Sequence, residues 1–453
     1  MLETMESGAS LDLGAPAIPR VAKASAGDGK GQHRIRIEQV CIGLHIKLDS
    51  WLGHPFLLSS FKIKNEEQIA ALKSMGLTDI EYLPGKSDAR PADLPAAADP
   101  GAAEAPEAVS GDAAGLEELM QVKKARIETL TQQRERIRTA ERKYGKTAND
   151  VQNVMRLANN SPGQAAKLSG EVAAELSETF LSEENTYIHL MGENVADESA
   201  YFHSLNVTVL SLILARALGI VDAEAMKDIA QGAVLHDVGN ALLPSQLLLK
   251  NEDLSTAEIN LLKMHPAYGI KVMQSVETLP ARVRQIILFH HEMVDGSGYP
   301  KGLKADTLDQ AVRIVAIANA YDELCNRRVA KHSKTPSEAL SYMYKSELAK
   351  YDKAALSAFI KALGIYPPGT IVKLVSGKVG IVMSADAQNM LHPNLMIYDP
   401  AIPKDEAAVV NLKRDLDDAI ERTLRPAALP EPIHKYLSPR TRVCYFVDHA
   451  GIN

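Results

Sequence analysis

The chain has 453 residues, a formal net charge of −7 and 24% charged residues. A chain of this length is expected to form about two or three domains. Because lysine and arginine do not outnumber the acids, the composition argues against nucleic acid as the main partner. The most apolar stretch, "VTVLSLILARALGIV", contains Arg216 and is too short to cross a bilayer, so no membrane insertion is expected.

The cysteines and the first residues both bear on the cellular compartment. Cys41, Cys325 and Cys444 are odd in number, far apart and not arranged as a metal-binding pair, so reduced thiols that simply pack are expected. The stretch "MLETMESGAS" has neither the basic start nor the apolar run of a secretory signal. These two observations predict a cytoplasmic protein.

The first part of the chain is predicted to hold a small α+β module between two segments without a core. Residues 1–33 mix Ala, Gly, Pro and charges without periodicity, as a disordered leader does. In residues 34–86, "RIRIEQV", "LHIKLD" and "DIEYLP" alternate like strands, and "NEEQIAALKSMGL" has helical spacing. Residues 87–114 are rich in Pro and Ala and are predicted to be a linker.

The remainder of the chain is predicted to be mostly helical, which makes the fold class mainly α. Residues 115–365 are helical in pattern almost throughout and form the large domain. Within residues 366–453, "IVKLV" and "VGIVMS" flank a short turn as in a hairpin, and "LMIYD" and "RVCYFVD" also resemble strands. A small β-rich extension is therefore expected to follow the helices.

Five histidines of the helical region lie at or near the ends of apolar helical segments. They are His203, His236, His265, His290 and His291, and Asp237 directly follows the second of them. Each histidine taken alone is more often a packed residue than a ligand, but five in equivalent positions favour a common site. His290 shares the helical spacing of the apolar residues Val283, Ile286 and Ile287, so it is expected to point inward. An imidazole in the interior needs a polar partner, and a metal ion is a suitable one.

The pair His236–Asp237 adds a carboxylate to this set. The two side chains are separated by about 100° around a helix, so both can reach one site between helices. A carboxylate has two oxygens and can bridge two ions. Two divalent ions can activate water at neutral pH and offset the charge of a phosphodiester. Many histidines with few acids therefore indicate phosphodiester hydrolysis.

The order "LHDVG", "HPAYG", "HHEMVDGSGYPKGL" and "RIVAIANAYDELCN" resembles the HD-GYP family, a branch of the HD phosphohydrolases that hydrolyses cyclic di-GMP. The stretch "SWLGHPFLLSSFKI" is similar to a domain of unknown function that often precedes HD-GYP domains. The resemblance implies two divalent ions, iron or manganese, and cyclic di-GMP as the ligand. It also implies site residues: metal ligands His203, His236, Asp237, His265, His290, His291 and Asn319; a loop with Asp295, Gly298, Tyr299 and Pro300; and phosphate contacts Arg328 and Lys331.

Three positions depart from the family pattern. Asn240 stands where the family usually has a catalytic lysine, and Asn319 stands where it has a metal-binding aspartate. Ser199 stands where some members have a glutamate that builds a third metal site, so at most two ions are expected. Asp322, three residues after Asn319, is a candidate for partial compensation because it lies on the same side of the helix.

Two classes of function follow from these residues. The first is a metal-dependent phosphodiesterase that opens cyclic di-GMP to pGpG and on to GMP, with Asp237, Asn240 and Asp295 in the catalytic set and turnover impaired by the asparagines. The second is a receptor that binds cyclic di-GMP, or a protein-interaction module for other signalling proteins, without turnover. Hydrolysis of a different nucleotide is a third possibility.

Overall fold

A computed structural model describes residues 33–48, 56, 60–93, 113–181, 187–190, 200–385, 391–400, 402–404, 407, 409–416, 418–438 and 445–448. Most of the leader and of the predicted linker, together with Ser199 and Cys444, lie outside these residues. Among the described residues, no helix combines the length and apolar character that crossing a bilayer requires. The domain boundaries given above stay predictions.

The N-terminal module is a small antiparallel sheet with one helix. Its strands are β1 (His33–Arg36), β2 (His45–Lys47), β3 (Ser60–Lys62) and β4 (Asp79–Tyr82), in the order β1-β4-β2-β3. Helix α1 (Glu66–Ser74) begins at Asn65, whose side chain accepts a hydrogen bond from the Gln68 backbone, and it is followed by Gly76 at φ +69°. The predicted strand "RIRIEQV" is shorter than expected, because Ile37–Gln39 form a 3-10 helix. The core of this module includes Leu44, Ile46 and Leu72.

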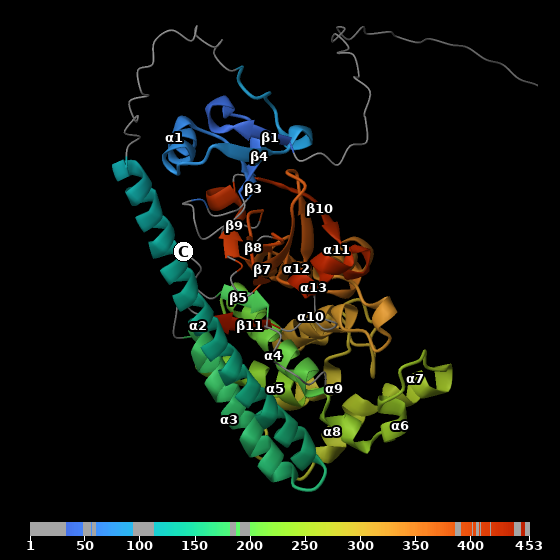
Figure 1. Ribbon diagram of the computed structural model, residues 1–453. Helices are drawn as coiled ribbons and strands as arrows, with labels where there is room; N and C mark the ends of the chain where they lie inside the picture. Colours follow the sequence, from blue (N-terminus) through green and yellow to red (C-terminus); the bar gives the residue numbers. More distant parts are fainter. Residues whose placement is uncertain are drawn as a thin grey trace, which may run out of the picture.

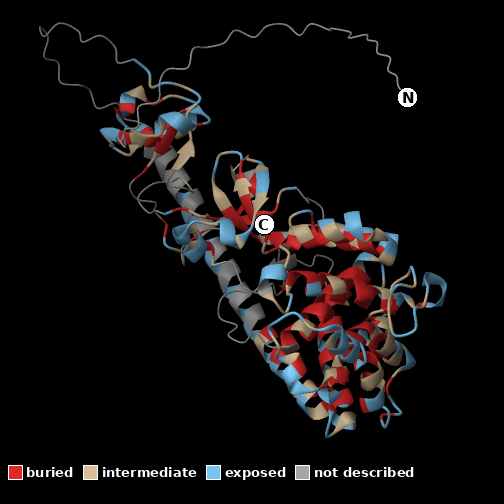
Figure 2. Cartoon of the chain, turned by 90° about the vertical axis from the view of Figure 1, so that its right-hand side faces the viewer, coloured by how far each residue is buried: buried red, intermediate tan, exposed pale blue. Residues whose placement is uncertain are grey.

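The mainly α fold class is confirmed by a long helix and a bundle of shorter ones (Figure 1). Helix α2 (Ala113–Ala158) runs beside the bundle and packs against α3 (Pro162–Leu181). The other helices are α4 (Ala200–Ala217), α5 (Ala223–Leu235), α6 (Ser245–Leu248), α7 (Thr256–Leu262), α8 (His265–Val272), α9 (Ala281–Phe289), α10 (Gln310–Cys325), α11 (Pro336–Ser346) and α12 (Lys353–Leu363). Figure 2 shows that buried residues concentrate in this bundle. Most of the apolar stretch around Arg216 lies in α4, whose described side chains are largely buried.

The C-terminal region contains a sheet, as predicted, but one of its strands comes from the helical region. The path of the sheet is β10-β6-β7-β5-β11, with β8 on β7 and β9 on β8. Its elements are β5 (Tyr187–Leu190), β6 (Ile371–Leu374), β7 (Val379–Ala385), β8 (Asn394–Ile397), β9 (Val409–Asn411), β10 (Ile420–Leu424), β11 (Tyr445–Asp448) and helix α13 (Glu431–Leu437). The sequence patterns do not predict β5, which pairs with both β7 and β11.

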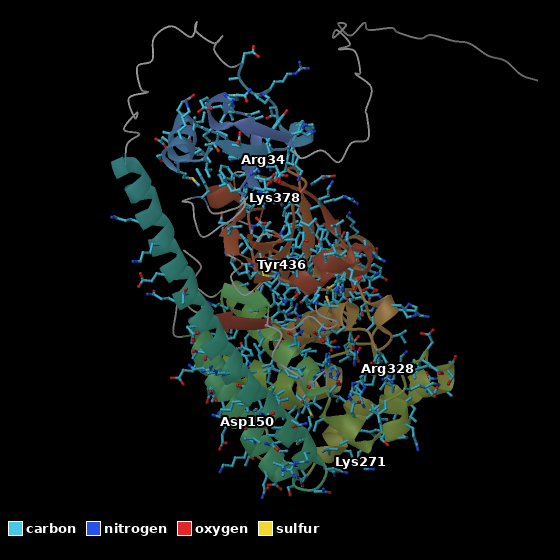
Figure 3. All side chains as sticks on the ribbon, in the orientation of Figure 1. Arg34, Asp150, Lys271, Arg328, Lys378 and Tyr436 are labelled. Atoms are coloured by element: carbon cyan, nitrogen blue, oxygen red, sulfur yellow. The ribbon has the colours of Figure 1, made fainter. Side chains whose placement is uncertain are left out.

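This sheet contacts the helices on one side and the N-terminal module on the other. The Tyr445 backbone N–H of β11 donates to Asn206 Oδ1 of α4 at 3.0 Å, and the hydroxyls of Tyr445 and Tyr321 are 2.7 Å apart. Towards the N-terminal module, Lys64 Nζ donates to the Leu416 carbonyl at 2.9 Å. Figure 3 shows Lys378, in the turn between β6 and β7, at this junction. In space, the C-terminal sheet therefore lies between the helical bundle and the N-terminal module.

Candidate metal centre

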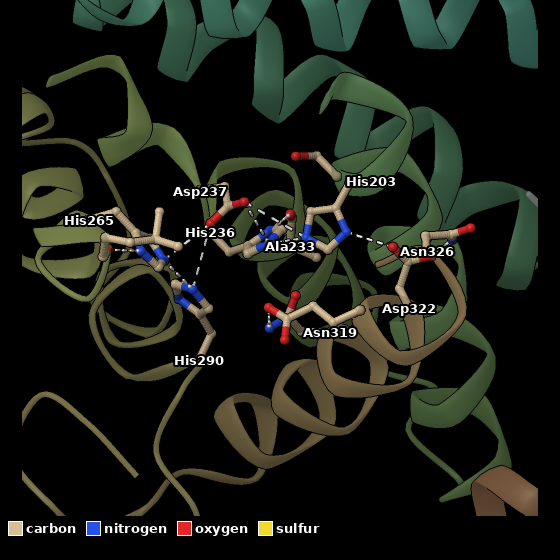
Figure 4. A network of polar contacts seen from close by, with 12 residues as sticks. His203, Ala233, His236, Asp237, His265, His290, Asn319, Asp322 and Asn326 are labelled. Carbon is tan, nitrogen blue, oxygen red and sulfur yellow. Dashed lines mark hydrogen bonds and ion pairs between the residues drawn. The ribbon is translucent and has the colours of Figure 1, made fainter. Parts of the chain in front are cut away.

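Four short backbone segments bring the predicted histidines to one place (Figure 4). His203 lies in the first turn of α4, His236 caps the C-terminus of α5, His265 begins α8, and His290 caps the C-terminus of α9. Two groups could each hold a metal ion, with ligand atoms within 4.8 Å of one another: His203, His236 and Asp237, and His265, His290 and His291. His290 is fully buried, which confirms the inward direction predicted from its helical spacing.

Glycines permit these segments to approach so closely. Asp237 is followed by the 3-10 helix η3 (Val238–Leu242), and a Cβ at Gly239 would overlap the His265 carbonyl oxygen and the Gly269 nitrogen of α8. A side chain at Gly239 would therefore push the carboxylate of Asp237 away from His265. The sequence "HDVG" thus couples the ligands to the contact between η3 and α8.

Hydrogen bonds to the ring nitrogens fix the direction of the histidine lone pairs. The Nδ1 atoms of His236, His265 and His290 lie 2.7, 2.7 and 3.0 Å from the carbonyl oxygens of Ala233, Leu262 and Ile287, respectively. A carbonyl can only accept, so Nδ1 of each ring carries the hydrogen, and Nε2 of the neutral ring carries a lone pair. In the same way, His203 Nδ1 lies 2.6 Å from Asp322 Oδ2.

The Nε2 atoms consequently face one another in two pairs. His203 Nε2 is 3.1 Å from His236 Nε2, and His265 Nε2 is 3.0 Å from His290 Nε2. Each pair can share one hydrogen or bind one metal ion through both nitrogens. Two nitrogens that are each about 2.1 Å from an ion, at right angles, are about 3.0 Å apart. The donor set therefore fits a metal ion at each pair.

The carboxylate of Asp237 lies between the two pairs. Its Oδ2 is 3.7 Å from both His203 Nε2 and His236 Nε2, while its Oδ1 is 3.2 Å from His265 Nε2 and 3.8 Å from His290 Nε2. One oxygen thus faces each pair of imidazoles. This is the arrangement expected of a carboxylate that bridges two ions.

The surroundings shift the pKa values of these groups in opposite directions. Burial lowers the pKa of His236 to about 4 and lowers those of His290 and His291 well below the usual value. For Asp237, burial raises the pKa, but the neighbouring histidines His236, His265 and His203 outweigh it and hold the pKa well below its usual range. Burial lowers the pKa of His265, but the hydrogen bond and the charge of Asp237 outweigh it and raise the pKa. Metal binds to neutral imidazoles and ionised carboxylates, so an ion in this site would displace a proton from His265.

Asp322 orients His203 from behind and does not face the site. Burial lowers the pKa of His203, but the hydrogen bond and the negative charge of Asp322 outweigh it and raise the pKa to about 9. The carboxylate of Asp322 also accepts from Asn206 Nδ2 and, at 2.8 Å, from Asn326 Nδ2. Both oxygens of Asp322 accept hydrogen bonds from these donors, so its partial compensation for Asn319 stays a prediction.

The two asparagines that depart from the family pattern share one feature. Asn319 is 2% exposed, and its Oδ1 has no hydrogen-bond partner among the described residues; the same is true of the buried Asn240 Oδ1. The Asn319 Nδ2 donates to Glu323 Oε1 at 3.2 Å. In Figure 4 the Asn319 side chain lies beside the gap between His203 and His290. An unpaired carbonyl oxygen there is available to a cation.

The glycine-rich loop closes against the second group of histidines. The ring of Tyr299 stacks on His291 with centroids 4.6 Å apart, and the Tyr299 N–H donates to the His291 carbonyl at 3.1 Å. A Cβ at Gly298 would overlap the backbone of His291, Glu292 and Met293, so only glycine fits. The peptide bond between Tyr299 and Pro300 is cis.

Two carboxylates hold this loop. Glu292 is buried, and its oxygens accept from the backbone of Lys301 at 2.6 Å and of Leu303 at 2.9 Å. Asp295 Oδ1 accepts from both the backbone and the hydroxyl of Ser297, at 2.9 and 2.6 Å. Asp295, predicted as catalytic, thus binds within its own loop. Glu292 directly follows the two histidines, and its role in holding the loop is not evident from the sequence.

The basic residues are distributed differently from the histidines. Arg328 Nη1 donates to the carbonyls of Leu247 and Lys250, and Figure 3 shows it on the side of the molecule where α6 and α7 lie. Lys331 is exposed. Within the described part of the chain, no hydrogen bond or ion pair joins either residue to the histidines. Lys263, which no sequence motif indicates, lies with Nζ 5.3 Å from the centroid of the Tyr299 ring.

Comparison with known families agrees with this geometry. Residues 156–355 match the HD domain, and residues 32–167 match a domain of unknown function, DUF3391. The helical region of the chain is therefore an HD domain. The match to this domain covers the five histidines and Asp237, and the second match covers the N-terminal module.

Several known proteins are similar to the chain. A cyclic di-GMP phosphodiesterase of Pseudomonas aeruginosa is 30% identical over 236 residues, which are 52% of this chain and 56% of that protein. A cyclic di-GMP phosphodiesterase response regulator of Xanthomonas campestris is 34% identical over 150 residues, 33% of this chain and 39% of that protein. A solved HD-GYP-type protein from Bdellovibrio bacteriovorus is 19% identical with a TM-score of 0.41, covering 72% of this chain and 97% of that one. The chain spans about half the length of the curated relatives it matches.

Proposed function

We propose that this chain is a metal-dependent HD-GYP phosphodiesterase that hydrolyses cyclic di-GMP to pGpG and on to GMP. The observation that carries the proposal is the two pairs of facing imidazole Nε2 atoms, one pair on each side of Asp237. A site built for two cations beside a solvent-accessible carboxylate suits a phosphodiester, whose negative charge increases during hydrolysis. The names of the curated relatives support the choice of cyclic di-GMP.

The roles of the chain's own residues follow from their positions. His203, His236, His265, His290 and His291 would hold two divalent ions, iron or manganese, with Asp237 between them and Asn319 beside the first. When bound, these ions supply an activated water and offset the charge of the phosphate. Tyr299, fixed on His291, presents an aromatic edge next to the site, and the Lys263 ammonium above that ring attracts an anionic substrate.

A receptor without turnover is the second candidate, and two observations favour it. Asn240 provides no positive charge at the position where the family usually has a lysine. The guanidinium of Arg328 is bound to the carbonyls of Leu247 and Lys250, so it would have to leave them to reach a phosphate. Both features lower the stabilisation of a developing anionic charge more than they lower binding.

Hydrolysis and binding separate the two candidates. The purified chain, loaded with Mn²⁺ or, without oxygen, with Fe²⁺, is incubated with cyclic di-GMP or cyclic GMP-AMP, and products are separated by chromatography. An enzyme releases pGpG or GMP at a rate that falls to background in His290→Ala. If cyclic di-GMP binds in calorimetry and no product forms with either metal, the receptor candidate is correct. If only cyclic GMP-AMP is consumed, the substrate assignment is wrong.

A further inference from the structure

Helix α10 directs four polar side chains towards one side. Asn319, Asp322, Glu323 and Asn326 are spaced by three, four and seven residues, so they share one face of the helix. Asp322 and Asn326 are bound to each other and lie behind His203. Asn319 and Glu323 form the other half of this face, one helical turn apart.

Asn319 and Glu323 are linked by the hydrogen bond from Nδ2 to Oε1 at 3.2 Å. This bond uses the amide group of Asn319 and leaves its buried Oδ1 without a partner among the described residues. For Glu323, this amide is the one hydrogen-bond donor in the part of the chain that the structure describes. Its other oxygen is open, since the side chain is exposed to solvent.

The charge of Glu323 acts on the metal centre. It is among the negative charges that raise the pKa values of His203 and His265, and it also acts on Asp237 and Tyr299. The hydrogen bond to Asn319, whose side chain lies beside the gap between His203 and His290, places Glu323 next to the site. Glu323 forms no ion pair with any described residue.

We propose that Glu323 is the anionic ligand of the ion held by His203, His236 and Asp237, and that Asn319 orients it. Glutamate is one methylene longer than aspartate, and Glu323 begins one turn further along the same face of α10 as Asn319. It can therefore bring a carboxylate oxygen to the place where the family has one from the helix position of Asn319. The inference rests on the proposed metal centre but not on the turnover of any substrate.

The charge balance explains why such a ligand is needed. Asp237 shares its single charge between both ions, so the first ion would otherwise be held by two neutral imidazoles, a neutral amide and half a carboxylate. Iron and manganese at octahedral sites favour at least one further oxygen anion. The substitution at Asn319 therefore does not by itself impair the site, because Glu323 supplies the missing charge.

The test measures metal binding without any substrate. Metal-free full-length protein is titrated with Mn²⁺ by calorimetry, and bound manganese is counted by elemental analysis after desalting. The variants are Glu323→Gln, which keeps shape and removes charge, and Glu277→Gln, which removes the same charge from an exposed position between α8 and α9. The double variant Asn319→Asp/Glu323→Gln moves the carboxylate to the usual position. Circular dichroism confirms that each variant is folded.

We expect the unaltered chain and Glu277→Gln to bind two Mn²⁺ ions each. In Glu323→Gln, the weaker of the two binding events should lose at least tenfold in affinity. The double variant should regain this affinity. The inference is overturned if Glu323→Gln binds both ions as tightly as the unaltered chain, if Glu277→Gln is equally weakened, or if the double variant does not recover. It is also overturned if the unaltered chain binds fewer than two ions. Two bound ions without hydrolysis would overturn the proposed enzyme and still support this ligand.

Discussion

Gly239 shows how a single missing side chain determines the site. Because a Cβ there would overlap the backbone of α8, Gly239→Ala should separate η3 from α8 and lower the free energy of unfolding by on the order of 3 kcal/mol. Metal binding should weaken too, since Asp237 moves with η3. Thermal melting and Mn²⁺ titration measure the two effects.

The chain offers a control for this change. A Cβ at Gly145, within α2, meets no atom, so Gly145→Ala should stabilise the protein by roughly 0.5–1 kcal/mol and leave metal binding unchanged. If the two variants melt alike, the close contact between η3 and α8 does not exist in solution.

Asp322, which accepts the hydrogen bond from His203 Nδ1, should affect metal affinity almost as strongly as a ligand does. Asp322→Asn removes the charge that holds the Nδ1 hydrogen of His203, so the ring becomes a weaker donor to the ion. We expect the affinity of the first metal to fall about tenfold, with the second metal unaffected. Calorimetric titration resolves the two events; equal affinities in variant and parent would show that the bond does not orient His203.

The meeting of the histidines at one place could be predicted because part of their signal is local. Histidines at helix ends that share the spacing of apolar residues must point inward, and His290 does. The roles of Glu292 and Glu323 could not be predicted in this way. One depends on a loop folding back to present the Lys301 and Leu303 amides, and the other on which face of α10 meets the site.

A chain of hydrogen bonds joins strand β11 to the metal centre. The Tyr445 N–H donates to Asn206, Asn206 donates to Asp322, and Asp322 holds His203. Asn206→Ala should therefore lower the affinity of the His203 site for metal and also speed amide hydrogen exchange in β11. Hydrogen exchange detected by mass spectrometry measures the strand, and Mn²⁺ titration measures the site.

Asn326→Ala provides the comparison for this prediction. Asn326 also donates to Asp322, at 2.8 Å, but it lies at the C-terminal end of α10, while Asn206 accepts the hydrogen bond from β11. We expect Asn326→Ala to lower the affinity of the His203 site for metal and to leave amide hydrogen exchange in β11 unchanged. Faster exchange in both variants would mean that the strand responds to general loss of stability.

In the C-terminal sheet, strands β6 and β7 could be predicted from the sequence and strand β5 could not, for a physical reason. Strands β6 and β7 are neighbours along the chain, and their alternating apolar residues flank a turn, so the hairpin has a local signal. Strand β5 has only four residues and pairs with β11, which follows after all the helices of the bundle. No local pattern records a pairing over that separation.

Across the molecule, the junction between the N-terminal module and the C-terminal sheet should respond to acid. Burial, with the positive charges of Lys378, Lys86 and Lys62, lowers the pKa of His45 to about 4. The unfolded chain binds a proton near pH 6.5 and the folded chain near pH 4, so stability should be full above pH 6.5 and fall as the pH decreases towards 4. The loss should reach at most about 3 kcal/mol.

Comparison with His45→Gln isolates this contribution from other titrating groups. Glutamine cannot take up the proton, so the difference in melting temperature between parent and variant should change between pH 7 and pH 5. His33→Gln, at an exposed position of β1, should show no such change. A difference that is constant with pH for His45→Gln would contradict the assignment.

The pairing of β5 with β11 also sets the order in which the protein can mature on the ribosome. The helices that carry the histidines are synthesised before β11, so they can assemble early from nearby contacts. Strand β5 must then wait, with an unpaired edge, until residues 445–448 emerge. Since Tyr445 of β11 fixes Asn206, nascent chains that stop short of β11 should hold His203 loosely, and metal acquisition becomes a late event of biosynthesis.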